Sequence, residues 1–214
     1  NYNVQAHKLG NVTATNNLAF NYFRGEFIEQ DYDKSFELFT DAYENGNKGS
    51  GCNLAFQYQK GLGVEKNLEK AINFYEENLN NDEADYLNDN IYCHNNLAFM
   101  YLNGIGVDID ELKALDLYKY GLDRNNNAAI VNTAWIYANA SQIEIDYDKA
   151  INFYKIAAEN GDGYSYGNLG WHYETGTGVN KDYKKAVEYY IKGDKLNNTY
   201  SSDRIKKFQE RVVK

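Results

Sequence analysis

Proline is absent from all 214 residues of the chain. Proline interrupts helix interiors, because its ring removes a backbone donor and clashes with the preceding turn. A chain of this length without proline suits helices joined by turns that use Gly and Asn instead. Tyrosine is abundant, at 21 residues.

Cysteine is nearly absent, with Cys52 and Cys93 as the two copies. Two are too few for a scaffold built on disulfides, and no Cys-x-x-Cys pair occurs. Free cysteine usually behaves as a small buried hydrophobe. We therefore expect two small, partly buried thiols.

Long apolar runs and excess positive charge are also missing. No stretch approaches the length of a membrane-spanning helix, so we predict no transmembrane segment. Lys and Arg number 22 against 31 Asp and Glu, which gives a net charge of −9. An acidic chain repels phosphate backbones, which argues against nucleic acid as the main partner, and it would steer a basic partner toward itself.

The compartment is not written in the sequence. The chain has neither an initiator Met nor a signal-like apolar segment. Cytoplasm is slightly favoured, and a secreted or periplasmic setting stays open because the N-terminus looks truncated. The phase of the first residues suggests a piece of a longer repeat array or a processed end.

What the chain does have is a repeat. The stretch NNLAF at residues 16–20 returns four times, twice nearly unchanged and twice as a looser echo. Its second Asn, here called the anchor, stands at Asn17, Asn53, Asn96, Asn132 and Asn168, with spacings of 36, 43, 36 and 36 residues. A fixed period in this range indicates a solenoid of stacked units. The seven extra residues fall in the polar stretch 80–90, where a longer loop is tolerated.

Other positions keep the same phase, written here as a number of residues after the anchor. Leu at +1 and Tyr at +5 predict one helix (helix A), which a Gly-x-Gly-Val turn ends. A second helix (helix B) carries a small residue at +18 and an aromatic at +22. We predict that helix B begins at N-cap residues Asp31, Asn67, Asp110, Asp146 and Asp182.

Some of these caps belong to Asp-x-Asp pairs, which also suggest a divalent cation. The phase favours caps instead, because the Gly and bidentate Glu of a calcium loop do not follow. We predict neither a metal nor a cofactor.

These phases predict one all-α domain over residues 1–214. Residues 1–12 end a preceding repeat, and five repeats cover about 13–48, 49–91, 92–127, 128–163 and 164–199. A polar capping helix over 201–214 follows, with Ser202 and Asp203 as its expected cap.

The pattern resembles the Sel-one-like repeat family, relatives of the tetratricopeptide repeats. The best match is Asn168-Leu169-Gly170-Trp171-His172-Tyr173, followed by Gly176, Gly178-Val179, Asp182 and Lys185-Ala186. The resemblance covers essentially the whole chain. It implies a right-handed superhelical α/α solenoid whose A helices line a concave surface, and a role as a scaffold or adaptor that binds proteins or peptides.

Two repeats depart from this pattern. In the first, Phe27 replaces the second turn Gly. In the fourth, Ala140 and Gln142 replace both turn Gly residues, and Thr133 replaces Leu. We expect the turns between helices A and B to differ in shape there.

The sequence offers little for catalysis. The three histidines, His7, His94 and His172, stand in different repeats at different phases, and no Ser-His-Asp motif gathers locally. We therefore predict that the protein is not an enzyme.

The concave face of the A helices is the better candidate site. At 3.6 residues per turn, +1 and +5 lie at roughly 100° and 140°, whereas the anchor lies at zero, +3 at roughly 300° and +7 at roughly 340°. The last three positions therefore point away from the core and toward one side. The predicted partner-binding groove comprises Asn17, Phe20, Arg24, Asn53, Phe56, Lys60, Asn96, Phe99, Asn103, Asn132, Trp135, Asn139, Asn168 and Trp171.

An Asn amide can hold a peptide backbone, and aromatic rings supply apolar anchors. Two structural alternatives stay open: the rings pack between neighbouring A helices, and the amides bond to each other. The leading hypothesis is a scaffold that binds a peptide or protein. The alternatives are a glycan-binding or cell-envelope module, and an acidic inhibitor or immunity protein for a basic partner.

Overall fold

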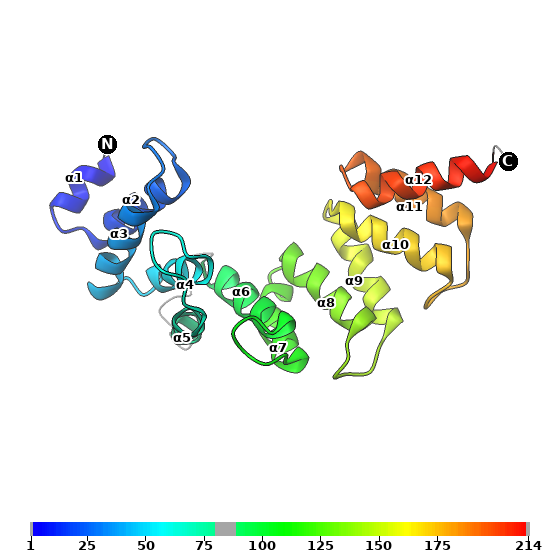
Figure 1. The fold of residues 1–214 in the computed structure, drawn as a ribbon, viewed down its shortest axis with the longest axis horizontal. Helices are drawn as coiled ribbons and strands as arrows, with labels where there is room; N and C mark the ends of the chain where they lie inside the picture. Colours follow the sequence, from blue (N-terminus) through cyan, green and yellow to red (C-terminus); the bar gives the residue numbers. More distant parts are fainter. Residues whose placement is uncertain (1, 80–88, 213–214) are drawn as a thin grey trace. The chain divides into compact units, whose positions relative to one another are not determined.

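The computed structural model describes residues 2–79 and 89–212, and these residues form twelve α-helices and no strand (Figure 1). The predicted all-α repeat architecture is confirmed. The chain divides into two compact units, which are described separately: unit 1 runs to Ile109 and unit 2 begins at Asp110.

Unit 1 contains α1 (Tyr2–Lys8), α2 (Val12–Arg24), α3 (Tyr32–Glu44), α4 (Ser50–Lys60), α5 (Leu68–Leu79) and α6 (Asp89–Asn103). The first two A–B pairs are α2 with α3 and α4 with α5, and α6 is the third A helix. Of the predicted insertion at 80–90, residues 80–88 lie outside the described residues, and the last two open α6.

Unit 2 contains α7 (Glu111–Leu122), α8 (Asn127–Asn139), α9 (Tyr147–Glu159), α10 (Gly163–Thr175), α11 (Tyr183–Lys195) and α12 (Thr199–Val212). The pairs α8 with α9 and α10 with α11 are the fourth and fifth repeats, and α7 packs against α8.

The predicted start of the last helix is wrong. Instead of beginning at the expected cap of Ser202 and Asp203, α12 begins at Thr199, because the Asn198 side chain accepts the Ser201 N–H at 2.8 Å. Arg204 stands 36 residues after Asn168, so α12 keeps the phase of a further A helix with Arg at the anchor.

The predicted caps of the B helices are confirmed. Each cap side chain accepts the backbone N–H three residues later, at distances of 2.8 to 3.0 Å: Asp31, Asn67, Asp110, Asp146 and Asp182. The Asp-x-Asp pairs therefore serve helix initiation. Among the described residues, no group of three or more His, Cys, Asp or Glu could hold a metal ion.

The core is built from positions +1, +2 and +22. Leu and Ala of helix A pack against the aromatic of helix B, which is fully buried as Phe39, Tyr75, Tyr118 and Tyr190 and nearly so as Tyr154. In two repeats the buried hydroxyl donates to position +6 of its own A helix: Tyr75 to Gln59 at 3.1 Å, and Tyr190 to Glu174 at 2.7 Å. The +5 tyrosines are half-buried.

The recurrent Lys at +17 has a structural role. Its ammonium lies over the +5 Tyr ring of the same repeat, at 4.9 to 5.4 Å from the ring centroid: Lys34 over Tyr22, Lys70 over Tyr58, Lys149 over Tyr137 and Lys185 over Tyr173. Such cation–π contacts contribute about 0.5–1 kcal/mol at exposed sites. Each one ties helix B to helix A at the outer surface.

The turn of the first repeat has the same backbone geometry as the Gly-x-Gly turns, so the expectation that its shape would differ is wrong. Gly25 and Phe27 have φ of 70° and 64°, close to the values at Gly61 and Gly63. A phenylalanine rarely takes this left-handed conformation. The Phe27 side chain is 91% exposed, so it meets no crowding there.

The turn of the fourth repeat does differ. Ala140 has φ of −57° and ψ of 148°, so it leaves the left-handed region. The buried Glu111 carboxylate replaces the glycine geometry by accepting Ser141 N–H at 2.9 Å and Gln142 N–H at 2.6 Å. Gln142 in turn accepts the Glu111 N–H at 2.9 Å. A reciprocal hydrogen-bond exchange thus joins α7 to this turn.

Candidate functional site

Unit 1 has a cavity of about 250 Å³ on the face formed by its three A helices. Five of its eight lining residues come from the first A helix and the third: Phe20, Phe23 and Arg24 from α2, and Tyr92 and Asn96 from α6. The other three, Cys52, Asn53 and Phe56, come from α4. The A-helix face is therefore hollowed where aromatic rings and amides meet.

Unit 2 has a cavity of about 260 Å³ on its own A helices α8, α10 and α12. Its lining is Trp135, Ala138, Asn139, Tyr154, Asn168, Trp171, His172 and Tyr200. Only Tyr154 comes from a B helix.

The two cavities are lined by residues at the same positions of the repeat. Six lining positions correspond in repeat phase, unit 1 before unit 2: Phe20 and Trp135, Phe23 and Ala138, Arg24 and Asn139, Asn53 and Asn168, Phe56 and Trp171, Tyr92 and Tyr200. Each cavity thus draws on three successive A helices.

Nine of the fourteen predicted groove residues line a cavity. Unit 1 brings together Phe20, Arg24, Asn53, Phe56 and Asn96, and unit 2 brings together Trp135, Asn139, Asn168 and Trp171. The other five line neither cavity: Asn17, Lys60, Phe99, Asn103 and Asn132. All five belong to A helices, and all are exposed or half-buried.

Sequence reasoning missed the tyrosine that stands four residues before the third anchor of each unit. Tyr92 and Tyr200 occupy this position, and each lines a cavity formed mainly by the two preceding A helices. Their shared phase was a signal, but it becomes visible only when α12 is recognised as a further A helix.

Of the five aromatic rings at +3, two pack against other rings and three are exposed. Phe20 packs edge-on against Phe39 at 5.2 Å between ring centroids, and Phe56 packs against Phe23 at 6.0 Å. By contrast, Phe99, Trp135 and Trp171 are 42%, 44% and 39% exposed. Packing between helices therefore accounts for the first two rings in part and leaves large apolar surface on the other three.

The amides behave differently from one repeat to the next. The Asn132 and Asn139 amides donate to carbonyls of their own helix, each at 3.0 Å. Asn96 makes a hydrogen-bonding contact with the buried Tyr75 hydroxyl, whose pKa burial raises. The Nδ2 of Asn53 is covered and has no hydrogen-bond partner among the described residues.

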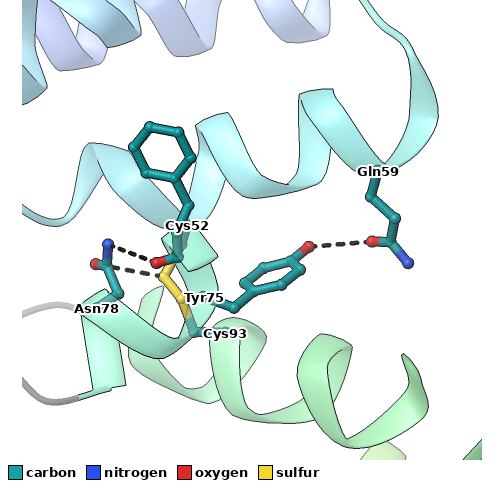
Figure 2. The surroundings of a disulfide bond; sticks show 6 residues. Cys52, Gln59, Tyr75, Asn78 and Cys93 are labelled. Atoms are coloured by element: carbon teal, nitrogen blue, oxygen red, sulfur yellow. Dashed lines mark hydrogen bonds between the residues drawn. A yellow bond between two sulfur atoms is a disulfide. The ribbon is translucent and has the colours of Figure 1, made fainter. Parts of the chain in front are cut away.

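A disulfide joins Cys52 to Cys93, so the expected free thiols are wrong. The two Cα atoms lie 5.5 Å apart, which suits a disulfide. Figure 2 shows the bond beside Asn78 and Tyr75 of α5, and the Asn78 Oδ1 lies 3.7 Å from the Cys52 sulfur. Because Cys52 belongs to α4 and Cys93 to α6, the bond fixes two of the three helices that form the unit 1 cavity.

Positive charge reaches the unit 1 cavity through Arg24. Its guanidinium lies 5.7 Å from the Phe20 ring centroid and 3.4 Å from Glu26 in an exposed ion pair. Lys60 lies over Phe56 in the same way, at 5.7 Å. In unit 2 the same helix position is Asn139 or Thr175, and both bond to a carbonyl of their own helix.

His172 is a structural residue of the unit 2 cavity. Burial lowers its pKa, so the neutral ring is favoured. Its Nδ1 lies 2.8 Å from the Thr177 carbonyl oxygen and donates to it, which holds the turn after α10. Gln57 does the same in the second repeat by donating to the Leu62 carbonyl at 3.2 Å.

A wider hollow of about 510 Å³ lies outside the A-helix face, at the start of α9. Its acidic lining includes Asp146, which already caps α9 and pairs with Lys149 at 3.0 Å. Backbone hydrogen bonding to Lys149 is the main cause of the lowered pKa of Asp146. The Asp146 carboxylate in this hollow is therefore already used to cap α9.

No helix in the described ranges has the length and apolar character to cross a membrane.

Comparison with known proteins bears on the whole chain. The sequence model of the Sel1 repeat matches residues 12–47, 52–77, 91–126, 127–162 and 163–193. No curated protein sequence matches the chain.

The fold is similar to solved structures. A protective antigen of uropathogenic Escherichia coli with an SLR fold is 20% identical with a TM-score of 0.82, over 99% of this chain and 44% of that one. This chain thus spans less than half of that structure. A Sel1 repeat protein from Oxalobacter formigenes is 22% identical with a TM-score of 0.76, over 90% and 76%. An immunity protein from Pseudomonas aeruginosa is 19% identical with a TM-score of 0.52, over 89% and 67%. Identities this low establish likeness of fold alone.

Proposed function

Because the chain belongs to the Sel1 repeat family, we propose that it is a non-catalytic scaffold or adaptor that binds a protein or peptide partner along its A helices. Proteins with this fold generally serve as interaction scaffolds, and a fold alone names no partner. The proposal therefore depends on the site.

One observation carries it: the same cavity is built on the A helices of each unit, chiefly from positions such as the anchor, +3 and +7 that are not core positions, with Tyr154 at +22 as an exception. Core packing uses +1, +2 and +22. The cavity positions instead leave Trp135 and Trp171 more than one-third exposed. Exposed aromatic side chains in a hollow are typical anchors of protein interfaces.

An extended segment of a partner suits this arrangement. An apolar side chain of the segment would enter the cavity of a unit, and the amides of that unit would bond to the segment's backbone without reading its sequence. Amides such as Asn132, which now bond to their own helix, can exchange that bond for one to a ligand carbonyl at little cost.

Peptide display on the whole chain tests the proposal. Wild-type protein should enrich peptides from a random library, and Trp135→Ala with Trp171→Ala should reduce affinity for peptides bound by unit 2 about tenfold or more, as expected for interface hot spots. Leu112→Ala is the matched control, since Leu112 is 62% exposed in the same unit but does not line the unit 2 cavity. Thermal unfolding would show that each variant still folds.

Glycan binding is the alternative that this experiment also addresses, because stacked rings and amides suit sugars as well. Cell-wall and polysaccharide fragments would be tested beside the peptides. Binding of fragments alone, with no enriched peptide, would overturn the scaffold proposal.

A second candidate is an acidic inhibitor for a basic partner, favoured by where the charge lies. Unit 1 carries seven Lys or Arg and sixteen Asp or Glu, whereas unit 2 carries fifteen of each. The whole net charge of −9 therefore belongs to unit 1. A basic partner steered by this charge would associate more slowly as salt rises. Salt-independent association would contradict this candidate.

The disulfide bears on the compartment. Disulfides persist in oxidising settings and are rare in the cytosol of mesophiles. The Cys52–Cys93 bond therefore favours a secreted or periplasmic place of action over the cytoplasm. Alkylation of thiols in freshly lysed native cells would test this, and labelling of both cysteines without prior reduction would contradict it.

A further inference from the structure

The unit 1 cavity differs from the unit 2 cavity in the size of the aromatic residues that line it and in its charge. These two differences indicate which kind of ligand it binds. It is lined by four aromatic rings, Phe20, Phe23, Phe56 and Tyr92, together with the Arg24 side chain. At about 250 Å³, it lies below the usual range of about 300–1,000 Å³ for sites that hold a whole small molecule. A single apolar side chain of a longer ligand is the better match.

We propose that this cavity binds an apolar side chain of a partner peptide with an Asp or Glu next to it, whose carboxylate meets Arg24. This inference rests on the proposed function, because it assigns a peptide sequence preference to one of the two cavities.

Arg24 is placed for this role. Its guanidinium is held over the Phe20 ring, so it stands at the mouth of the aromatic pocket. Its present partner is Glu26, and the two side chains are 59% and 54% exposed. Exposed ion pairs of this kind contribute little to stability, so a ligand carboxylate can compete with Glu26. A planar guanidinium also binds a carboxylate through two parallel hydrogen bonds.

The net negative charge of unit 1 does not prevent an acidic peptide from binding at Arg24. At physiological salt the Debye length is about 8 Å, so carboxylates farther away are largely screened. A carboxylate in contact with Arg24 is subject mainly to that contact. We therefore expect slow association of an acidic peptide at low salt but a preference for it in the bound state.

Asn53 supplies a second reason to expect an acceptor in the ligand. Its Nδ2 is covered and has no partner within residues 2–79 and 89–212. A buried donor without a partner is destabilising, because it has lost its hydrogen bond to water. A rotation of the Asn53 side chain that brings this amide to the cavity surface would let a peptide carbonyl or carboxylate accept its hydrogen bond.

Unit 2 lacks the positive charge at the corresponding position. Asn139 stands in place of Arg24, and its amide bonds to the Trp135 carbonyl at 3.0 Å. Trp171 stands in place of Phe56. The unit 2 cavity therefore has no reason to prefer an acidic neighbour, which makes it an internal control.

The test uses the whole chain in its oxidised form. Peptides enriched by display would be resynthesised in pairs that differ by Asp against Asn beside the apolar residue, and affinities would be measured by fluorescence anisotropy. The Asp peptide should bind unit 1 about two- to fivefold more tightly than its Asn partner, which is the gain expected for an exposed ion pair. Arg24→Gln should abolish that difference, and Arg24→Lys should keep part of it.

Two further variants separate this inference from the proposed function. Asn139→Arg should create an Asp preference for peptides bound by unit 2. Asn53→Ala should weaken the Asp and Asn peptides of unit 1 alike. Equal affinities within each pair, with Arg24→Gln without effect, would overturn the inference while peptide binding itself stands. Absence of any enriched peptide would overturn the proposed function and the inference with it.

Discussion

Units 1 and 2 each have a cavity of the same design on their A helices. They differ in the bonds that stabilise these helices and in their net charge. Unit 1 uses a covalent bond between α4 and α6 and carries the entire net charge. Unit 2 is neutral and uses buried polar groups: Glu111 binds the fourth turn, and Arg204 pairs with Glu174 beside the Tyr190 hydroxyl. The repeat therefore determines where a side chain points and builds the core, whereas residues that differ from one repeat to another add stability and charge that are specific to each unit.

Removing the disulfide should have the largest effect, confined to unit 1. The Cys52→Ser and Cys93→Ser double variant opens a loop closed across a separation of 41 residues. Loop-closure entropy predicts a loss of about 4 kcal/mol in free energy of unfolding. Hydrogen exchange resolved by helix would measure it. Faster exchange in α4 and α6 is expected, and equal acceleration in α8 and α10 would contradict the assignment to unit 1.

Removing the Glu111 carboxylate should be the next largest effect, and it should fall on unit 2. Glu111→Ala leaves the Ser141 and Gln142 backbone donors without their acceptor, at a cost of about 2–3 kcal/mol. Chemical denaturation followed at α8 and α9 would measure the loss. Glu37→Ala is the control, because Glu37 is exposed on α3. Equal losses in the two variants would show that the reciprocal hydrogen-bond exchange contributes nothing.

Lowering the pH should also weaken the hydrogen bonds that Glu111 accepts, with a smaller effect than removal of the carboxylate. Burial opposes ionisation of Glu111, but hydrogen bonds from Ser141 and Gln142 outweigh it and hold its pKa below the ordinary value. A depressed folded-state pKa gives stability that is present above the unfolded pKa and is lost as pH falls through the folded pKa. The difference in unfolding free energy between wild type and Glu111→Gln should therefore shrink in acid. A difference that is constant with pH would contradict this.

Asn132→Ala should change stability least, by about 0.5 kcal/mol or less. Its amide bonds to a carbonyl of its own helix, and alanine is a better helix former. The same substitution at Asn96 should cost more, because Asn96 contacts the buried Tyr75 hydroxyl. Thermal unfolding of the two variants would compare them. A larger loss at Asn132 would mean that this anchor position is structural.

Much of the fold followed from the sequence, because five copies of one pattern report the same directions. The Asp31-type caps, the buried +1 leucines and the +22 aromatics were predicted from phase and are observed. Residues outside the phase were harder to place. Cys52 and Cys93 stand at different positions relative to their anchors, so nothing local showed that α4 and α6 bring them together.

The candidate site was predictable in direction only. Helical geometry pointed the anchor, +3 and +7 positions to one side, and nine of the fourteen predicted residues line the two cavities. Their separate environments were not predictable, because they depend on neighbouring helices: Asn53 has an unpartnered amide, whereas Asn139 bonds to Trp135. Whether these residues bind a partner stays a prediction.

Crosslinking with an enriched peptide tests the central claim most directly. The peptide would carry a photoreactive group in place of its apolar side chain, and mass spectrometry would locate the attached residue on the oxidised protein. Attachment to cavity residues of α2, α4 and α6, or of α8, α10 and α12, is the predicted result. Attachment chiefly to exposed residues of the B helices, such as Leu112 of α7, would contradict the account.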